Sequence, residues 1–306
     1  MKTRLKTYKL LFVSAAMLIT THLLANGGDA EKTKSYSKSY AVSSTDNITI
    51  DNRFGETRLE TWNSNEVKVD VQIRVVASSD DRAQSLIDDI NIEDGKSSNG
   101  VYFRTNIDNH RDNGKGHTEM HIDYVVHLPA NNPLTLDTQF GDTYLPDYNG
   151  HIDIENKFGS LKAGNIKNAG DIDIEFGKAD IEGLNNGKLT IKYSGFTLGK
   201  MSGDIDARFE FCDASKISID NNIKSLDLYN SYSTVKISTS KDLSATFDIE
   251  THFGDFSNHT DFSIKEDADK NQEWRSPRFD YHYQGKAGSG STMIKIKSNF
   301  GSTTIM

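Results

Sequence analysis

Residues 170–184, GDIDIEFGKADIEGL, alternate between apolar and polar side chains. Two isoleucines and Phe176 fall on one side of this segment and three acidic residues on the other, because successive side chains of a β-strand point to opposite faces. Gly177 then allows a bend that a Cβ atom would crowd, and a second run places Ala179 and Ile181 inward. The pattern predicts two short strands joined at a corner, with the carboxylates on a solvated outer face.

The same unit recurs along the chain. Nine aromatic residues are each followed by Gly, Ser or Cys, and from Phe140 the spacings are 18, 18, 17, 18, 21, 21 and 47 residues. A fixed period of this length is typical of a solenoid, in which each repeat stacks on the next. We therefore predict an all-β fold, a single-stranded parallel β-solenoid whose coils of about 18 residues are marked by aromatic-Gly corners. The aromatic residues are Phe54, Phe140, Phe158, Phe176, Tyr193, Phe211, Tyr232, Phe253 and Phe300.

Stacking of such coils places equivalent inward residues above one another, about 4.8 Å apart. We expect two inward ladders, one aliphatic and one aromatic. Their members are Ile154, Ile174 and Ile191 in the first row and Phe158, Phe176, Tyr193 and Phe211 in the second.

The segment 46–133 has a different pattern. It contains five strand candidates, three before residue 78 and two after residue 99. Between them, residues 78–93 predict one helix, because Ser79 can cap it and four apolar residues follow at helical spacing. We expect this helix to cap the exposed apolar end of the solenoid.

The pattern at the N-terminus predicts a targeting segment. Four basic residues precede the apolar run 10–20, which is typical of a secretory signal peptide, although an N-terminal membrane anchor remains an alternative. The predicted organisation is a signal peptide at 1–25, a flexible leader at 26–45 and one solenoid domain at 46–306. Within that domain, 46–133 hold the N-terminal strands and capping helix, and 134–306 hold regular coils with an insertion near 262–288.

Net charge and cysteine content limit the partners and the covalent cross-links that can be expected. Removing residues 1–25 takes away four basic residues and no acidic one, so the formal net charge moves from −9 to −13. An acidic chain is not expected to bind nucleic acid or an anionic membrane through bulk electrostatics. Cys212 is the only cysteine, so no intrachain disulfide can form, and we interpret it as a buried corner residue.

Residues 121–166, HIDYVVHLPANNPLTLDTQFGDTYLPDYNGHIDIENKFGSLKAGNI, resemble the bacterial putative-adhesin β-strand-repeat family. The resemblance rests on an extended segment that leads into the first Phe-Gly coil, followed by further Phe-Gly coils, and it covers roughly residues 40–306. It implies a parallel β-solenoid, secretion to the periplasm or cell surface, and an adhesin label without catalytic residues.

The sequence contains little that points to catalysis or to metal binding. There is no Gly-x-Ser-x-Gly elbow, and the glycine-rich segment 285–292 lacks the terminal Gly-Lys-Ser/Thr of a phosphate loop. His117, Glu119 and His121 share one face of a strand, so a zinc site there is conceivable, but no further ligand can be named. The repeats lack the Gly-Gly-x-Gly-x-Asp pattern of calcium-binding solenoids, which leaves only weak calcium binding on the acidic face. Neither a catalytic residue, a metal ligand nor a cofactor is predicted.

The segment 262–288 is the one irregular, aromatic-rich surface candidate. Aromatic and arginine side chains in a loop suit contacts with a glycan or a protein. The alternative is that this segment forms a strand that seals the C-terminal coils. The candidate partner-binding residues are Trp274, Arg275, Arg278, Tyr281, His282 and Tyr283.

These observations favour a non-enzymatic, exported protein of the periplasm or cell surface that acts as an adhesin-like interaction or structural module. The expected partner is an unidentified envelope protein or glycan, with no nucleic acid and no membrane span in the mature chain. Two alternatives stay open: a glycan-active hydrolase or lyase on the same scaffold, and an accessory protein of envelope stress or signalling.

Overall fold

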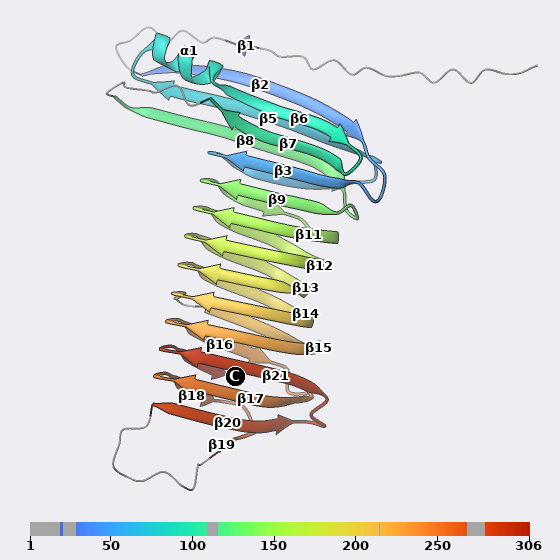
Figure 1. Cartoon of the computed structure of the whole chain (residues 1–306), viewed down its shortest axis with the longest axis vertical. Coiled ribbons are helices and arrows are strands. Elements are labelled where there is room, and N and C mark those ends of the chain that lie inside the picture. Colours follow the sequence, from blue (N-terminus) through green and yellow to red (C-terminus); the bar gives the residue numbers. More distant parts are fainter. Residues whose placement is uncertain (1–18, 21–28, 109–115, 214, 268–278) are drawn as a thin grey trace, which may run out of the picture.

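The computed structural model describes residues 19–20, 29–108, 116–213, 215–267 and 279–306 (Figure 1). Over these residues the protein is all-β with one short helix, and its strands belong to one large, mostly parallel sheet. None of the helical structure in these residues is long and apolar enough to cross a membrane.

The N-terminal elements are β1 (Ile19–Thr20), β2 (Ala30–Ala41), β3 (Asn47–Arg53), β4 (Thr57–Trp62), β5 (Glu66–Ala77), α1 (Asp80–Asp88), β6 (Ile90–Ser97), β7 (Gly100–Ile107) and β8 (Thr118–Pro129). The middle elements are β9 (Leu134–Gln139), β10 (Thr143–Leu145), β11 (Tyr148–Lys157), β12 (Ser160–Glu175), β13 (Lys178–Lys192), β14 (Gly195–Glu210) and β15 (Ser215–Ser231). The C-terminal elements are β16 (Thr234–Thr239), β17 (Ala245–His252), β18 (Asp255–Asn258), β19 (Ser263–Glu266), β20 (Asp280–Ala287), β21 (Thr292–Asn299) and β22 (Ser302–Ile305).

Parallel strands stack along two faces. The front face in Figure 1 runs through β3, β9, β11, the C-terminal parts of β12 to β15, and then β21, β17 and β20. The other face runs through β8, β4, β10, the N-terminal parts of β12 to β15, and then β16, β22 and β18. Each of β12 to β15 therefore contributes to both faces.

Differences in repeat length are absorbed where these long strands pass from one face to the other. In β12, Ile166 pairs with Leu184, whereas Asp171 pairs with Lys188, so the offset falls from 18 to 17 residues within one strand. Similar register shifts occur within β13 and β14. The aromatic corner before each strand keeps its place despite the changing length.

The core between the two faces consists of inward aliphatic rows. Ala179 and Ile181 are buried, as the sequence predicts. The expected row of Ile154, Ile174 and Ile191 is wrong in one member, because Ile154 pairs with Ile172, while Ile174 pairs with the buried Asn156. One continuous row, at most 2% exposed, is Leu136, Ile154, Ile172, Leu189, Ala207 and Leu228.

The aromatic corner residues lie outside the core, contrary to the prediction. Phe158, Phe176, Tyr193 and Phe211 are 45–50% exposed, and each has a φ of 50–56°. This left-handed conformation is uncommon for residues other than glycine. The alternation of inward and outward side chains therefore ends at the residue before each aromatic residue. The ring points outward, although continued alternation would place it on the inward face.

The N-terminal segment forms an antiparallel layer over one end of the parallel strands (Figure 1). The prediction of a flexible leader is wrong for residues 30–41, because β2 pairs with β5 along its whole length. Helix α1 begins after Ser79, whose Oγ accepts a hydrogen bond from the backbone N–H of Arg82 (3.3 Å). It is shorter than the predicted 78–93, since Ile90 already starts β6.

The C-terminal residues do not stack in chain order. Strand β21 lies between β15 and β17 and pairs in parallel with both, and β22 lies likewise between β16 and β18. Residues 292–305 therefore form a coil inserted before the one that precedes them in sequence. The 47-residue gap from Phe253 to Phe300 reflects this insertion together with β19 and β20, which pair antiparallel with each other.

Cys212 occupies a buried corner, as interpreted from the sequence. Its Sγ lies 3.2 Å from the carbonyl oxygen of Ile191 and 3.3 Å from that of Glu210. Ser194 and Ser233 hold the equivalent corners of neighbouring coils, and each hydroxyl donates to the carbonyl two residues earlier. Burial raises the pKa of the Cys212 thiol, so the unreactive thiol form is favoured.

We expect Cys212→Ser to change the free energy of unfolding by no more than about 1 kcal/mol, because serine already fits the same corner twice. The native wild-type thiol is expected to resist a disulfide reagent such as DTNB at pH 8 and to react fully in urea. Absorbance of the released thionitrobenzoate measures both states. Rapid stoichiometric reaction of the folded protein would contradict the buried position.

Candidate functional site

The predicted partner-binding residues fall in two groups. Trp274, Arg275 and Arg278 lie outside the described residues. Tyr281, His282 and Tyr283 lie in β20, which pairs antiparallel with β17, so this part is a strand and not an irregular loop.

Strand β20 follows β17 on the front face, and β19 pairs with its other edge (Figure 1). The rings of Tyr281 and Tyr283 are 6.4 Å apart, and Tyr283 also lies 5.0 Å from Phe256. On the opposite side of the strand, His282 Nε2 lies 2.7 Å from Asp248 Oδ1. This arrangement matches the strand alternative for the three residues, and their role in binding a partner stays a prediction.

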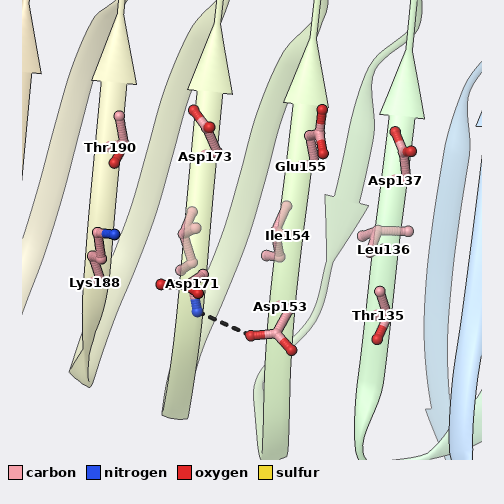
Figure 2. Close-up of a pocket in the computed structure, with 11 residues that line it drawn as sticks. Thr135, Leu136, Asp137, Asp153, Ile154, Glu155, Asp171, Asp173, Lys188 and Thr190 are labelled. Atoms are coloured by element: carbon pink, nitrogen blue, oxygen red, sulfur yellow. Dashed lines mark hydrogen bonds between the residues drawn. The ribbon is translucent and has the colours of Figure 1, made fainter.

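The acidic residues that open the sequence pattern lie on the outer side of the front face (Figure 2). Asp137, Glu155 and Asp173 stand in one row on β9, β11 and β12. Asp153 and Asp171 stand in the next row, where the backbone N–H of Asp171 donates to Asp153 Oδ1 (2.9 Å). The row ends at β13, where Thr190 and Lys188 take the corresponding positions, and the hollow over these side chains measures about 410 Å³.

Like charges in this row perturb one another. Burial, with Asp51 and Glu155 nearby, raises the pKa of Asp137. Burial and the neighbouring Glu175 raise the pKa of Asp173. The row thus carries an electrostatic cost that neighbouring lysines only partly offset.

Basic side chains border the acidic row on its corner side. Lys157 contacts Glu155, and Lys192 Nζ lies 3.5 Å from Glu175 Oε1. Among the described residues, no group of three or more His, Cys, Asp or Glu side chains is placed to hold a metal ion. His117 and His121 both approach Glu119, at 2.9 and 4.0 Å, without a further ligand from the described chain.

We expect Asp173→Asn to stabilise the protein at pH 7 by about 0.5–1 kcal/mol, because burial and the neighbouring Glu175 disfavour the charged carboxylate that the substitution removes. A carboxyl whose pKa is raised in the folded state favours folding at low pH, and this contribution is lost as the pH rises through the folded pKa. The gain over wild type should therefore shrink as the pH falls toward 4. Urea unfolding at pH 4, 5.5 and 7 measures it.

Asp171→Asn is the matched control, on the same strand but in the exposed row beside Lys188. Its difference in stability from wild type should change less between pH 4 and 7 than the corresponding difference for Asp173→Asn. Destabilisation by Asp173→Asn at pH 7 would show that the carboxylate is favourable in the fold and would contradict the predicted repulsion.

A second surface feature was missed from the sequence. Aromatic rings from successive corners stack in one continuous line on the outside of the molecule, and we name this line the aromatic ladder. Along nine rings, neighbouring centroids are 4.8–5.1 Å apart and the planes differ by 1–7°. In spatial order the ladder is Phe54, Phe140, Phe158, Phe176, Tyr193, Phe211, Tyr232, Phe300 and Phe253, with Phe279 adjoining its end at 4.4 Å.

All ten rings are 38–50% exposed, and the nine corner residues from Phe54 to Phe300 have φ values of 49–64°. A left-handed backbone at residues other than glycine costs of order 1 kcal/mol each and persists where the surroundings enforce it. Stacking of each ring between two neighbours offsets part of this cost.

The N-terminal end of the ladder borders a hollow of about 590 Å³. Phe54, Phe140 and Phe158 line one side. The start of β8 lines the other, with Met120 and His121. The volume lies within the range of small-molecule sites.

Carboxylates complete the lining of this hollow. Asp123 Oδ1 accepts the backbone N–H of Glu56, and Asp142 Oδ1 accepts the backbone N–H of Ser160, both at 2.8 Å. Glu56 is neutralised by Arg58 at 2.6 Å. The hollow therefore combines aromatic rings with hydrogen-bond acceptors held in place by the main chain.

Comparison with known proteins returned no matching family model and no curated relative. Solved structures do resemble this chain. A putative adhesin from Bacteroides fragilis is 12% identical with a TM-score of 0.43, and 89% of this chain and 97% of that chain are covered. A putative adhesin from Parabacteroides distasonis is 9% identical with a TM-score of 0.29, over 89% and 97% of the two chains. A putative lipid binding protein from the same species is 10% identical with a TM-score of 0.30, over 89% and 96%.

The first two of these descriptions name the family that the sequence resemblance indicates, namely the putative adhesins.

Proposed function

We propose that this chain is a non-enzymatic, exported, adhesin-like module of the bacterial periplasm or cell surface, built as a β-solenoid with α1 at its capped end. The observation that carries the proposal is the aromatic ladder. Ten rings of about 200 Å² each at 38–50% exposure present on the order of 800 Å² of apolar surface in one line. The largest apolar patch of a typical monomer is about 300–600 Å² and is often functional.

The shape of the scaffold supports an interaction role. Parallel strands with continuous ladders of main-chain hydrogen bonds hold every ring at a fixed step along the stack. A rigid array of this kind loses little conformational entropy when a partner binds. It suits attachment to an extended partner more than enclosure of a small substrate.

Binding to cell surfaces tests the proposal. The purified exported chain, carrying a fluorescent label, is mixed with bacterial cells and with epithelial cells, and flow cytometry follows the bound label. We expect saturable binding that unlabelled protein displaces, with no turnover of envelope polysaccharides by mass spectrometry. Turnover of a glycan would overturn the proposal. So would the absence of saturable binding to both kinds of cell.

A further inference from the structure

The rings of the aromatic ladder stack in parallel with a sideways offset. Their centroids are 4.8–5.1 Å apart, whereas stacked carbon atoms touch at about 3.5–4.0 Å, so parallel rings at this spacing must be offset sideways. Each ring therefore exposes a strip of its face together with its edge. The exposed surface repeats once per coil along the stack, which suits a linear polymer with a short repeat.

The charges beside the ladder indicate whether the polymer that binds there is charged. Immediately before the rings stand Arg53, Lys157 and Lys192 together with Glu175 and Glu210. Several of these are already paired within the protein, such as Lys192 with Glu175 at 3.5 Å. Because charges of both signs stand along the ladder and several are already paired, neither a polyanion nor a polycation gains a large net attraction there.

Polar groups beside the rings at the hollow nevertheless offer hydrogen bonds. At the hollow, Asp123 and Asp142 supply carboxylate acceptors that backbone amides hold in place. Carboxylates accept hydrogen bonds from hydroxyl groups and bind them more strongly than neutral acceptors do. An uncharged polymer rich in hydroxyl groups, with apolar C–H surfaces to set on the rings, meets both demands.

From this geometry we infer, resting on the proposed adhesin-like function, that the aromatic ladder binds a neutral linear chain of β-linked hexopyranose units. The hollow at Phe54, Phe140 and Phe158 takes a terminal part of the chain, and further units lie along the ladder toward Phe176. The sugar C–H faces contact the exposed ring strips, and the hydroxyls donate to Asp123 and Asp142.

Isothermal titration calorimetry of the exported chain with cellohexaose and with N-acetylchitohexaose tests this site. We expect at least one hexasaccharide to bind and Phe140→Ala/Phe158→Ala to weaken that binding about tenfold, the effect of losing two ring contacts. Asp142→Asn keeps the acceptor for Ser160 and removes the charge, so it should weaken binding about threefold without unfolding the protein.

The matched control is Tyr232→Ala/Phe300→Ala, which removes two ladder rings of the same kind far from the hollow. It should lose comparable stability but bind the hexasaccharide within about twofold of wild type. Equal weakening by both double variants, or weakening only by Tyr281→Ala/Tyr283→Ala, would overturn the placement of the site.

Three further outcomes would overturn the inference while leaving the adhesin-like function intact. The first is saturable attachment to cells with no heat from either hexasaccharide. The second is ladder-dependent binding to neutral phosphatidylcholine vesicles, which would assign the surface to lipid. The third is concentration-dependent dimerisation in sedimentation velocity that Phe140→Ala/Phe158→Ala abolishes, which would assign it to a second copy of this chain.

Discussion

Replacing Phe209 by alanine is expected to lower the free energy of unfolding by about 3–5 kcal/mol, whereas Phe211→Ala, two residues later, should cost only about 1–2 kcal/mol. Phe209 is fully buried, and its ring lies 4.3 Å from that of Phe196. Phe211 is 45% exposed and loses only its stacking contacts with Tyr193 and Tyr232. Urea unfolding followed by circular dichroism measures both variants.

This pair separates the structure from the sequence pattern. Simple alternation places Phe209 and Phe211 on the same inward side, so it predicts similar losses for both. Phe196→Leu serves as a control, because leucine keeps most of the apolar volume of the ring that packs against Phe209. Equal costs for Phe209→Ala and Phe211→Ala would contradict the outward turn of the corner residue.

The second large effect is expected at a glycine corner. A Cβ atom added at Gly177 lies 1.9 Å from the carbonyl oxygen of Gly159, far inside van der Waals contact. Gly177→Ala should therefore cost about 1–3 kcal/mol or more, as neighbouring coils must separate. At Gly195 the nearest atom, the carbonyl oxygen of Asp213, is 3.5 Å away. Gly195→Ala is expected to be neutral or to stabilise by up to about 1 kcal/mol, because alanine restricts the unfolded chain.

Thermal unfolding of the two alanine variants side by side measures the contrast. Ser194 and Cys212 already carry a Cβ atom at corners equivalent to Gly177, each with its side chain bonded to a nearby carbonyl. Wild-type stability in Gly177→Ala would mean that the corner of Gly159 moves at little cost. The tight stacking of glycine corners would then not be a requirement of the fold.

The strand class and the repeat could be predicted because they follow from local alternation and from distance along the chain. The failure for Ile154 shows what the alternation leaves open. Counted back from the aromatic residue, Ile154 is four positions before Phe158, as Ile172 is before Phe176, whereas Asn156 occupies the place of Ile174. The pairing of Ile154 with Ile172 could be counted from the sequence. Because Ile172 and Ile174 are the same residue type, however, the residue types alone did not distinguish the two possible partners.

The side on which the aromatic rings lie could not be obtained from alternation alone. It depends on a positive φ at residues such as Phe158 and Phe176, a conformation that few side chains adopt and that nothing local to the strand requires. The available signal was the Gly, Ser or Cys directly after each ring, a small residue that marks the end of strand geometry. Extending the period of two as far as the ring predicted a core row where the structure has the aromatic ladder.

The candidate loop shows the opposite difficulty. Tyr281 and Tyr283 alternate with His282 in a pattern that fits a strand as well as a binding loop, and β17 supplies the partner strand that decides between them. The order of β15, β21 and β17 was equally beyond a local pattern, since parallel pairing between distant segments leaves no mark within either one. Only the long spacing between Phe253 and Phe300 indicated that the regular order breaks.

The inserted position of β21 and β22 has a consequence for how the protein is made. Residues 215–239 and 245–258 flank a gap that stays open until residues 292–305 have emerged and entered it. Synthesis proceeds from the N-terminus, so this part of the stack cannot form progressively as the chain emerges. A polypeptide interrupted before Thr292 keeps two unpaired strand edges, which quality-control proteases can recognise. The arrangement thus ties completion of this part of the stack to the synthesis of residues 292–305.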